Sequence, residues 1–307
     1  MKNEKRHHTI EEQVQLLLGR GLEGDPDLMA SRLAVVNYYR LSGYWFPMQM
    51  GPSYPEIIGA TPETFRPGST FENVWRRYTF DRELRLLVLD AIERFEVAVR
   101  TQLAYHHAFI HGPFGYANDP KSRPKLKRED FAKFYAGLLE ELGRSKEQCI
   151  KHYFKKYGDE HDVPPIWQAV EVMSFGNIVT LYRHTTSKVK QGVASTFGIP
   201  DTVMESWLLS LNTIRNICAH HSRLWNRELG NRPMIPRLEE FPDWHLPVQI
   251  RNERLFGILT ILKYSMNRIA PQSQWALRFH QFLADYPDIP IADMGFPENW
   301  DQNPIWK

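Results

Sequence analysis

Residues 71–111 read FENVWRRYTFDRELRLLVLDAIERFEVAVRTQLAYHHAFIH. In this segment apolar residues recur every three or four positions, which places them along one face of an α-helix. The residues that keep this spacing are Leu84, Leu87, Val88, Ala91, Phe95, Ala98, Val99 and Leu103. Phe80-Asp81 is expected to divide the segment into two helices, and Gly112-Pro113 to end it. The longest periodic segment of the chain is therefore predicted to be helical.

Most of the remaining chain shows the same spacing. Thr9-Ile10-Glu11-Glu12 has the pattern of a capping box, and Asp25-Pro26 combines an N-cap residue with a first-turn proline. The further helices expected from such signals span about 10–20, 26–40, 129–143, 145–157, 166–174, 177–185, 187–197, 202–229, 251–269 and 271–286. No segment alternates polar and apolar residues as a strand does. We predict an all-α fold, a multi-helix bundle with irregular proline-rich excursions.

The chain has no sharp linker, so its predicted division follows the helix pattern. Residues 1–70 form an N-terminal helical segment with an irregular excursion from Pro47 to Ser69, residues 71–286 form the main domain, and residues 287–307 form an extended C-terminal tail. Apolar residues in the tail, including Phe296 and Trp300, favour packing of the tail on the core.

Composition limits the class of protein. The chain has 307 residues, of which 42% are hydrophobic and 13% aromatic, and this is typical of a folded globular chain. Its net charge of +2 is too small to demand a polyanionic partner. Cys149 and Cys218 are its only cysteines, so a disulfide framework or zinc ribbon is excluded. A charged N-terminus and short apolar runs predict a cytoplasmic protein without a signal peptide or membrane span.

Residues 215–227 read RNICAHHSRLWNR and carry the most polar chemistry of any predicted helix. In a helix that continues to residue 229, a rotation of about 100° per residue groups Asn216, His220, Arg223 and Arg227 within roughly 40° of one another. Arg215 flanks this polar stripe. The opposite, apolar face includes His221, which favours a buried structural histidine there.

The residue types on this stripe favour handling of phosphate. Metal binding is disfavoured because neither a carboxylate nor a second aligned histidine is nearby, and no cofactor is expected. RNA is cleaved without metal when its 2′-hydroxyl attacks the adjacent phosphate, which needs a base, an acid and positive charge on the phosphate. His220 can serve as base or acid, Arg215 can fork onto phosphate oxygens, and Asn216 can orient the imidazole. Arg223, Arg227 and His221 are candidate RNA-binding residues.

One helix supplies only one such histidine, whereas a base and an acid require two proton carriers. Arg215 and His220 also differ by about 140° around the helix axis. A two-fold homodimer solves both problems, because it sets two motif helices side by side. The sequence thus predicts a composite site with two arginines and two histidines.

The string RNICAHHSRLWNR resembles the Abi family of bacterial abortive-infection proteins, and Arg215-x4-His220 resembles the Arg-x4–6-His signature of HEPN domains, small helical domains that often act as metal-independent ribonucleases. Other segments that resemble the Abi family are Asn37–Tyr44, Phe80–Arg85, Ala91–Glu96, Pro165–Trp167, Met173–Gly176 and Met294–Pro297. The resemblance implies a HEPN-like helical unit in an intracellular phage-defence protein that cleaves RNA to halt growth of an infected cell. It implies that Arg215 and His220 are the catalytic pair, with Asn216 beside them. Some members of such systems are held in check by a small RNA or a protein, so a small regulatory RNA and an antitoxin-like protein are candidate partners.

Several other groups are weaker candidates. Arg100 and His106 also match Arg-x4–6-His, although a buried polar pair that stabilises the helix is the favoured interpretation. His107 and His111 have the i, i+4 spacing of two metal ligands but lack an acidic third ligand. The basic loop 121–128, with Arg76, Arg77, Arg82 and Arg85 upstream, could track a phosphate backbone. Tyr38, Tyr39, Tyr44 and Trp45 could stack on bases, but a helix end packed on the core is favoured.

Three functions remain open at this stage. The leading one is a HEPN-type endoribonuclease acting in abortive infection, with RNA as substrate and no membrane partner. The second is a non-catalytic RNA-binding or regulatory HEPN protein. The third is a helical scaffold whose polar stripe is a protein interface.

Overall fold

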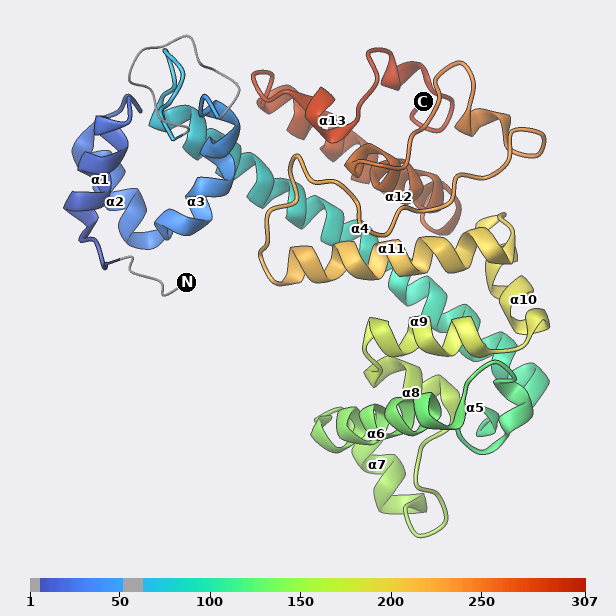
Figure 1. The fold of residues 1–307 in the computed structure, drawn as a ribbon. Coiled ribbons are helices and arrows are strands. Elements are labelled where there is room, and N and C mark those ends of the chain that lie inside the picture. Colours follow the sequence, from blue (N-terminus) through green and yellow to red (C-terminus); the bar gives the residue numbers. More distant parts are fainter. Residues whose placement is uncertain (1–5, 52–62) are drawn as a thin grey trace. The chain divides into compact units, whose positions relative to one another are not determined.

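The structure is a computed structural model that describes residues 6–51 and 63–307. Within this part of the chain all regular elements are helical, which confirms the predicted all-α fold (Figure 1). Its α-helices are α1 (Ile10–Gly19), α2 (Pro26–Val35), α3 (Tyr38–Trp45), α4 (Phe71–His111), α5 (Gly115–Asn118), α6 (Arg128–Arg144), α7 (Gln148–Tyr157), α8 (Ile166–Val172), α9 (Phe175–His184), α10 (Ser187–Phe197), α11 (Asp201–Ala219), α12 (Leu255–Ile269) and α13 (Trp275–Asp285). None of the helices in the described ranges has the length and apolarity that a membrane crossing needs.

The chain divides into two compact units, Met1–Leu84 and Arg85–Lys307, with the boundary inside α4. In the first unit, α1 and α2 contact each other. The predicted capping box is confirmed, since the Thr9 hydroxyl accepts from the Glu12 N–H and the Glu12 side chain accepts from the Thr9 N–H. Of the predicted excursion at Pro47–Ser69, residues 52–62 lie outside the described residues. Gln49 and Phe65 on either side of them form an isolated antiparallel bridge.

The predicted helix 26–40 is wrong, because the chain forms two helices there. α2 ends at Val35, and Val36 takes an extended backbone. Asn37 then caps α3, its side chain accepting a 2.7 Å hydrogen bond from the Tyr39 N–H. Asparagine bonds readily to the backbone two residues on, which favours a new helix start over continuation.

α4 is a single helix, so the predicted break at Phe80-Asp81 is also wrong. Both residues are fully buried. The Asp81 carboxylate accepts a 2.6 Å hydrogen bond from the Tyr44 hydroxyl. A buried carboxylate that is hydrogen-bonded does not force the backbone out of the helix, and neither residue is a helix breaker.

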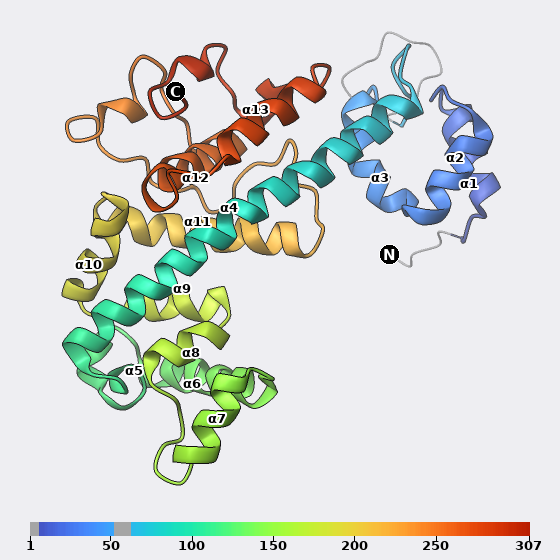
Figure 2. The same ribbon diagram turned by 180° about the vertical axis from the view of Figure 1, so that it is seen from behind.

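The second unit packs its helices around a core rich in aromatic residues. α11 contacts α9, α10 and α12, α10 contacts α12, and α6 contacts α8 and α9. The fully buried Trp207 of α11 lies 5.4 Å from the ring of Trp244, which is also fully buried. Figure 2 shows residues of α4 beyond the unit boundary crossing in front of α11 and α9. This framework holds the end of α11, where the motif begins.

The C-terminal tail lies on the second unit. The Trp306 side chain is only 3% exposed, its Nε1–H donates to Thr260 Oγ1 at 3.0 Å, and its ring stacks on Phe256 at 5.9 Å. The Asn303 amide, fully buried, donates to the carbonyl oxygens of Asp243 and Val248.

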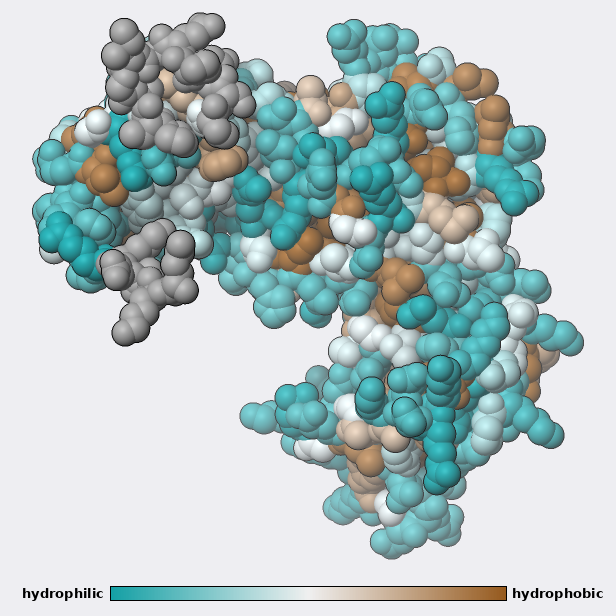
Figure 3. Space-filling view, viewed as in Figure 1, coloured by the Kyte–Doolittle hydropathy of each residue, from teal (hydrophilic) through white to brown (hydrophobic). Residues whose placement is uncertain are grey.

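The surface seen from the side of Figure 1 is mostly hydrophilic, with hydrophobic residues in small separate patches (Figure 3).

Candidate functional site

α11 carries the first part of the motif on its last turn. The buried residues of this helix recur every three or four positions and face its neighbours. They are Val203, Met204, Trp207, Leu208, Ser210, Leu211, Ile214 and Cys218. Arg215 and Asn216 lie off this face, the first half-buried and the second exposed. The Arg215 Nη1 donates to Asn216 Oδ1 at 3.4 Å, so arginine and amide stand side by side at the helix end.

The helix ends at Ala219 and not at residue 229 as predicted. The Ser222 N–H donates to the Ile217 carbonyl at 2.9 Å, and the His221 N–H donates to the Cys218 carbonyl at 3.0 Å. These two bonds make a Schellman motif, in which the residue after the cap takes the left-handed conformation. That residue is His221, with φ +56°. Because its side chain contains a Cβ, this conformation costs about 1 kcal/mol relative to glycine.

The early end of α11 corrects the predicted polar stripe. His220 is the cap residue, and its N–H still donates to the Asn216 carbonyl at 2.9 Å. Arg223 and Arg227 follow the end of the helix, so the rotation of about 100° per residue does not apply to them. The Arg227 guanidinium folds back onto the Arg223 carbonyl at 3.1 Å. The local sequence has no glycine or proline before Gly230, so the usual signal for a helix end is absent.

The predicted burial of His221 is wrong as well. Both His220 and His221 are exposed. The prediction assumed a continuous helix, which would have turned His221 toward the core. The left-handed residue changes the direction of the chain, so two consecutive imidazoles reach solvent at the end of α11.

The segment after the helix is fixed to the second unit at several points. Leu224 and Trp225 are fully buried. The buried Arg85 of α4 donates to the Ser222 carbonyl at 3.5 Å. Farther along, the Arg254 guanidinium donates to Asn226 Oδ1 at 3.0 Å and to Glu228 Oε1 at 3.2 Å. The motif therefore continues as an ordered turn and not as a free loop.

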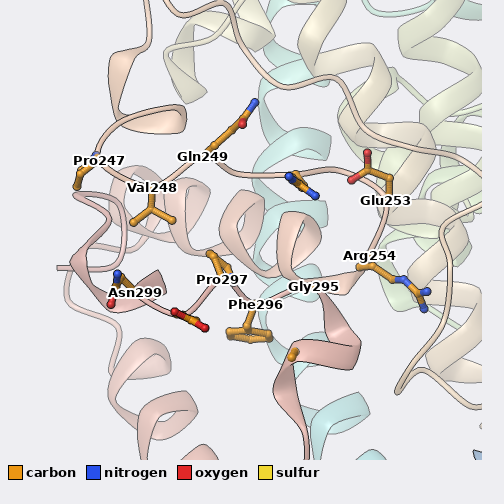
Figure 4. A pocket seen from close by; sticks show the side chains of 12 residues that line it. Pro247, Val248, Gln249, Glu253, Arg254, Gly295, Phe296, Pro297 and Asn299 are labelled. Atoms are coloured by element: carbon orange, nitrogen blue, oxygen red, sulfur yellow. The ribbon is translucent and has the colours of Figure 1, made fainter.

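Arg254 also borders a pocket of about 720 Å³ between residues 247–254 and the tail (Figure 4). A Cβ on Gly295 would come within 2.6 Å of the Arg254 Cβ, and Gly295 has φ +88°. Only glycine lets the tail pass so close to Arg254 in this conformation. The tail segment Met294–Pro297 thereby supports the arginine that holds the turn after the motif helix.

Arg215 lies in a cleft of about 520 Å³ beside α4. The residues that line this cleft are Leu89, Asp90, Ile92, Glu93, Glu96, Val97, Arg100, Glu171 and Arg215. Within the described part of the chain Arg215 has no ion pair, and neither Glu93 nor Glu171 has one. The cleft therefore combines one uncompensated arginine with two uncompensated carboxylates, a feature that the sequence pattern did not indicate.

The second Arg-x-His segment is engaged in packing. The Arg100 guanidinium, 12% exposed, pairs with Glu96 and donates to the Val170 carbonyl in α8. His106 lies against α10, where a Cβ on Gly192 would come within 2.5 Å of the imidazole Nδ1. The two side chains contact different helices, α8 and α10, so they join α4 to its neighbours.

His107 and His111 lie side by side, with ring centroids 5.0 Å apart. His107 is fully buried, neither of its ring nitrogens has a hydrogen-bond partner, and burial lowers its pKa to about 4. The His111 Nε2 contacts Thr186 Oγ1 at 3.0 Å, and burial lowers the pKa of this group as well. Among residues 6–51 and 63–307, no three His, Cys, Asp or Glu side chains are grouped so that they could hold a metal ion.

Among the basic loop 121–128 and the aromatic residues near α3, some side chains are buried in the fold and others are exposed. Arg123 of the basic loop is 7% exposed, donates to the Asp119 carbonyl at 2.7 Å, and lies over the Phe131 ring at 3.7 Å. Its role is therefore structural. The remaining cations of the loop are exposed: Lys121, Lys125, Lys127 and Arg128. Of the aromatic residues near α3, Tyr44 and Trp45 are buried, whereas Tyr39 is 85% exposed.

Comparison with known protein families gives one match. The model of the family described as Abi-like protein matches residues 31–226, a range that begins within α2 and includes all but the last residue of the motif. The chain belongs to the Abi-like protein family. This Abi-like protein has no significant match among curated proteins or among solved structures. The matched range contains Arg85 and the whole of residues 215–226, so most of the site geometry lies within the shared region.

Sequence reasoning missed the residues that shape the site of this Abi-like protein from outside the motif. Arg85 and Arg254 fix the turn after α11 although they lie far from it in sequence. Glu93 and Glu171 face the Arg215 cleft from two other helices. The sequence had marked Arg85 as part of the string Phe80–Arg85 and as a possible phosphate contact, whereas the structure buries it and bonds it to the Ser222 carbonyl. No spacing rule connects the other three to the motif.

Proposed function

We propose that this Abi-like protein is a metal-independent, HEPN-type endoribonuclease of an abortive-infection system, acting on RNA in the cytoplasm. Membership of the Abi-like family suggests the defence role. The observation that carries the proposed chemistry is the end of α11, where exposed His220 follows Arg215 and Asn216 by one turn. A homodimer supplies the second set of these residues.

The reaction is an internal phosphoryl transfer. One His220 imidazole removes the proton of the RNA 2′-hydroxyl, and the oxygen attacks the adjacent phosphorus. The P–O5′ bond breaks, and the 5′-oxygen takes a proton from the second, protonated His220. The products are a 2′,3′-cyclic phosphate and a 5′-hydroxyl, so atoms and charge balance without an added reagent.

Arg215 supplies positive charge at the C-terminal end of α11, where the helix dipole alone would be negative. The C-terminal end of a helix carries about −0.5 elementary charge from its free carbonyls, which repels phosphate. Arg215 on the last turn opposes that field, and Arg223 and Arg227 follow directly after it. A guanidinium can donate two parallel hydrogen bonds to phosphate oxygens, which stabilises the extra negative charge of the transition state. Asn216 orients the His220 imidazole.

Purified protein incubated with mixed RNA in EDTA tests the proposal. Cleavage that leaves cyclic-phosphate ends, and that disappears in Arg215→Ala and His220→Ala, supports it. Binding of RNA without cleavage supports the non-catalytic RNA-binding function instead, and neither binding nor cleavage supports the scaffold. Cleavage by His220→Ala at the wild-type rate contradicts the catalytic assignment.

The exposure of His221 allows a second arrangement of the proton carriers, which competes with the composite site. Two solvent-facing imidazoles in one chain supply both a base and an acid, so a single copy would contain all the proton carriers. In the composite site His221 has no proton-transfer role and contributes only to RNA binding. A substitution that keeps the left-handed cap, His221→Gly, separates the two arrangements.

A further inference from the structure

The outward side of α4 in the second unit is unusually apolar. Val97, Tyr105 and Phe109 on this side have exposed fractions of 54%, 65% and 82%. Trp167 at the start of α8, 52% exposed, lies with Tyr105 and Phe109 around a groove of about 460 Å³. Figure 2 shows α4 in front of the unit with no other helix drawn over this part. Monomeric proteins rarely leave so many large apolar side chains together in water.

The groove continues into the cleft that holds Arg215. Glu171 lines both hollows, and Val97 and Glu93 line the cleft beyond it. We call the continuous surface formed by Val97, Tyr105, Phe109, Trp167, Glu93 and Glu171 the α4–α8 face. The candidate catalytic arginine therefore lies at one end of an exposed apolar surface.

The size of the α4–α8 face fits a protein partner. An aromatic side chain buries about 150–250 Å². The exposed parts of Tyr105, Phe109 and Trp167 thus offer about 400 Å², roughly half of the ~800 Å² that each partner of a stable complex buries. The aliphatic and charged residues of the same face supply further area, and aromatic residues are the usual energetic centres of interfaces.

The charges on the face select among partners. Glu171 lines the apolar groove and has no ion pair in the described part of the chain, so it disfavours RNA phosphate in the groove itself. Glu93, also without an ion pair there, lines the adjoining cleft. Arg215 also has no ion pair and lies in the same cleft. One surface thus carries both signs of uncompensated charge beside an apolar centre. Such a surface is self-complementary, because across a two-fold axis residue i meets residue j while j meets i.

We propose that the α4–α8 face is the interface with a second copy of this chain. The apolar grooves of the two copies pack together, and the arginine of each copy lies opposite the carboxylates of the other. A guanidinium has five N–H donors, so Arg215 can approach a carboxylate there and still donate to an RNA phosphate. The two-fold axis then brings both Arg215 side chains to one interface. This inference rests on the proposed composite site, which needs the second copy, and it assigns the surface through which that copy binds.

Sedimentation velocity of the full chain across ~1–50 µM tests the interface, since complexes of this size span micromolar to picomolar affinity. The variant Phe109→Glu changes a side chain that is mostly in solvent, so the fold is kept, and circular dichroism checks this. Leu277→Glu on α13, exposed to 66%, is the matched control. We expect a wild-type dimer, a dissociation constant raised about thirtyfold or more by Phe109→Glu, and no change with Leu277→Glu.

A wild-type chain that stays monomeric, or a dimer that Phe109→Glu leaves intact, overturns the interface. RNA cleavage measured on the same samples keeps the two proposals apart. Loss of both dimer and cleavage in Phe109→Glu supports interface and composite site together. If Phe109→Glu is monomeric but still cleaves RNA, the interface stands and the composite site is rejected. If the wild type forms a dimer that depends on Phe109 but never cleaves RNA, the interface stands and the ribonuclease function is rejected.

Discussion

Two segments of this chain carry an arginine followed five or six residues later by a histidine, and their environments differ completely. At the end of α11, His220 is exposed and Arg215 faces a cleft without an ion pair. In the last third of α4, Arg100 is held by Glu96 and the Val170 carbonyl, and His106 lies against α10. The spacing is nearly the same, but Arg100 is already held by two partners, whereas Arg215 has no ion pair within the described part of the chain.

The difference comes from what surrounds each helix. α4 has neighbours along the segment that holds Arg100, so polar side chains there are used to join helices. α11 ends at Ala219, and a helix end presents its last side chains to solvent without a following turn to cover them. At the end of α11, therefore, the side chains of the Arg-x-His pair are accessible to a ligand, whereas in α4 the corresponding side chains join helices.

The largest expected effect is a loss of RNA cleavage when the histidine at the end of α11 is replaced. His220→Ala should lower the RNA cleavage rate by about 10²–10⁴-fold, because it removes a proton carrier from the transition state. The melting temperature should not change, since the side chain is exposed. Single-turnover cleavage with a labelled RNA measures the effect. His152→Ala on α7, also an exposed histidine, is the control and should cleave at the wild-type rate.

The next effect tests whether the α4 segment is structural. Burial, together with the charges of His111 and Arg123, lowers the pKa of His107 to about 4. In the unfolded chain the imidazole titrates near 6.5, so the unfolded state binds more protons between these values. The stability associated with neutral His107 is present above pH 6.5 and is lost as pH falls toward 4, by about 3 kcal/mol at full effect.

Urea unfolding of the wild type and His107→Leu between pH 7 and pH 4 measures this loss. The variant keeps a side chain of similar size but cannot titrate. Its free energy of unfolding should fall less steeply with acid than that of the wild type, by about 1.4 kcal/mol for each pKa unit of the shift. Parallel curves for the two proteins would mean that His107 is already protonated in the folded chain.

Sequence reasoning located helix ends where the signal was local and missed them where the cause was tertiary. The run 71–111 matches α4 at both bounds, because apolar spacing and Gly112-Pro113 are local signals. The end of α11 was missed because His221 takes the left-handed place that glycine usually fills. Its cause is tertiary, since burial of Leu224 and Trp225 directs the chain inward. The approach of Arg254 and Glu171 to the motif region depends on packing between distant segments, which no spacing reveals.

A smaller effect measures the structural role of Arg100. Arg100→Ala should lower the free energy of unfolding by about 2 kcal/mol, because Glu96 and the Val170 carbonyl lose a largely buried partner. Arg144→Ala is the matched control: it also removes an i, i+4 pair, with Glu140, but both side chains there are exposed. Such a pair contributes about 0.3–0.5 kcal/mol. Equal losses in the two variants would contradict the structural assignment of Arg100.

The smallest expected effect on stability comes from His221→Gly, and the same variant tests which residue is the second proton carrier. His221 holds a left-handed backbone with φ +56° at the position of the Schellman motif where glycine is favoured. His221→Gly should therefore raise the free energy of unfolding by up to about 1 kcal/mol, whereas His221→Val should lower it, because a β-branched side chain tolerates this conformation least. Since glycine keeps the cap, Arg215, Asn216 and His220 stay in place, and any change in cleavage reports on the missing imidazole. The composite site predicts a pH–rate profile with the same two limbs as the wild type. If His221 is the second proton carrier, one limb disappears and the rate falls about 10²-fold or more.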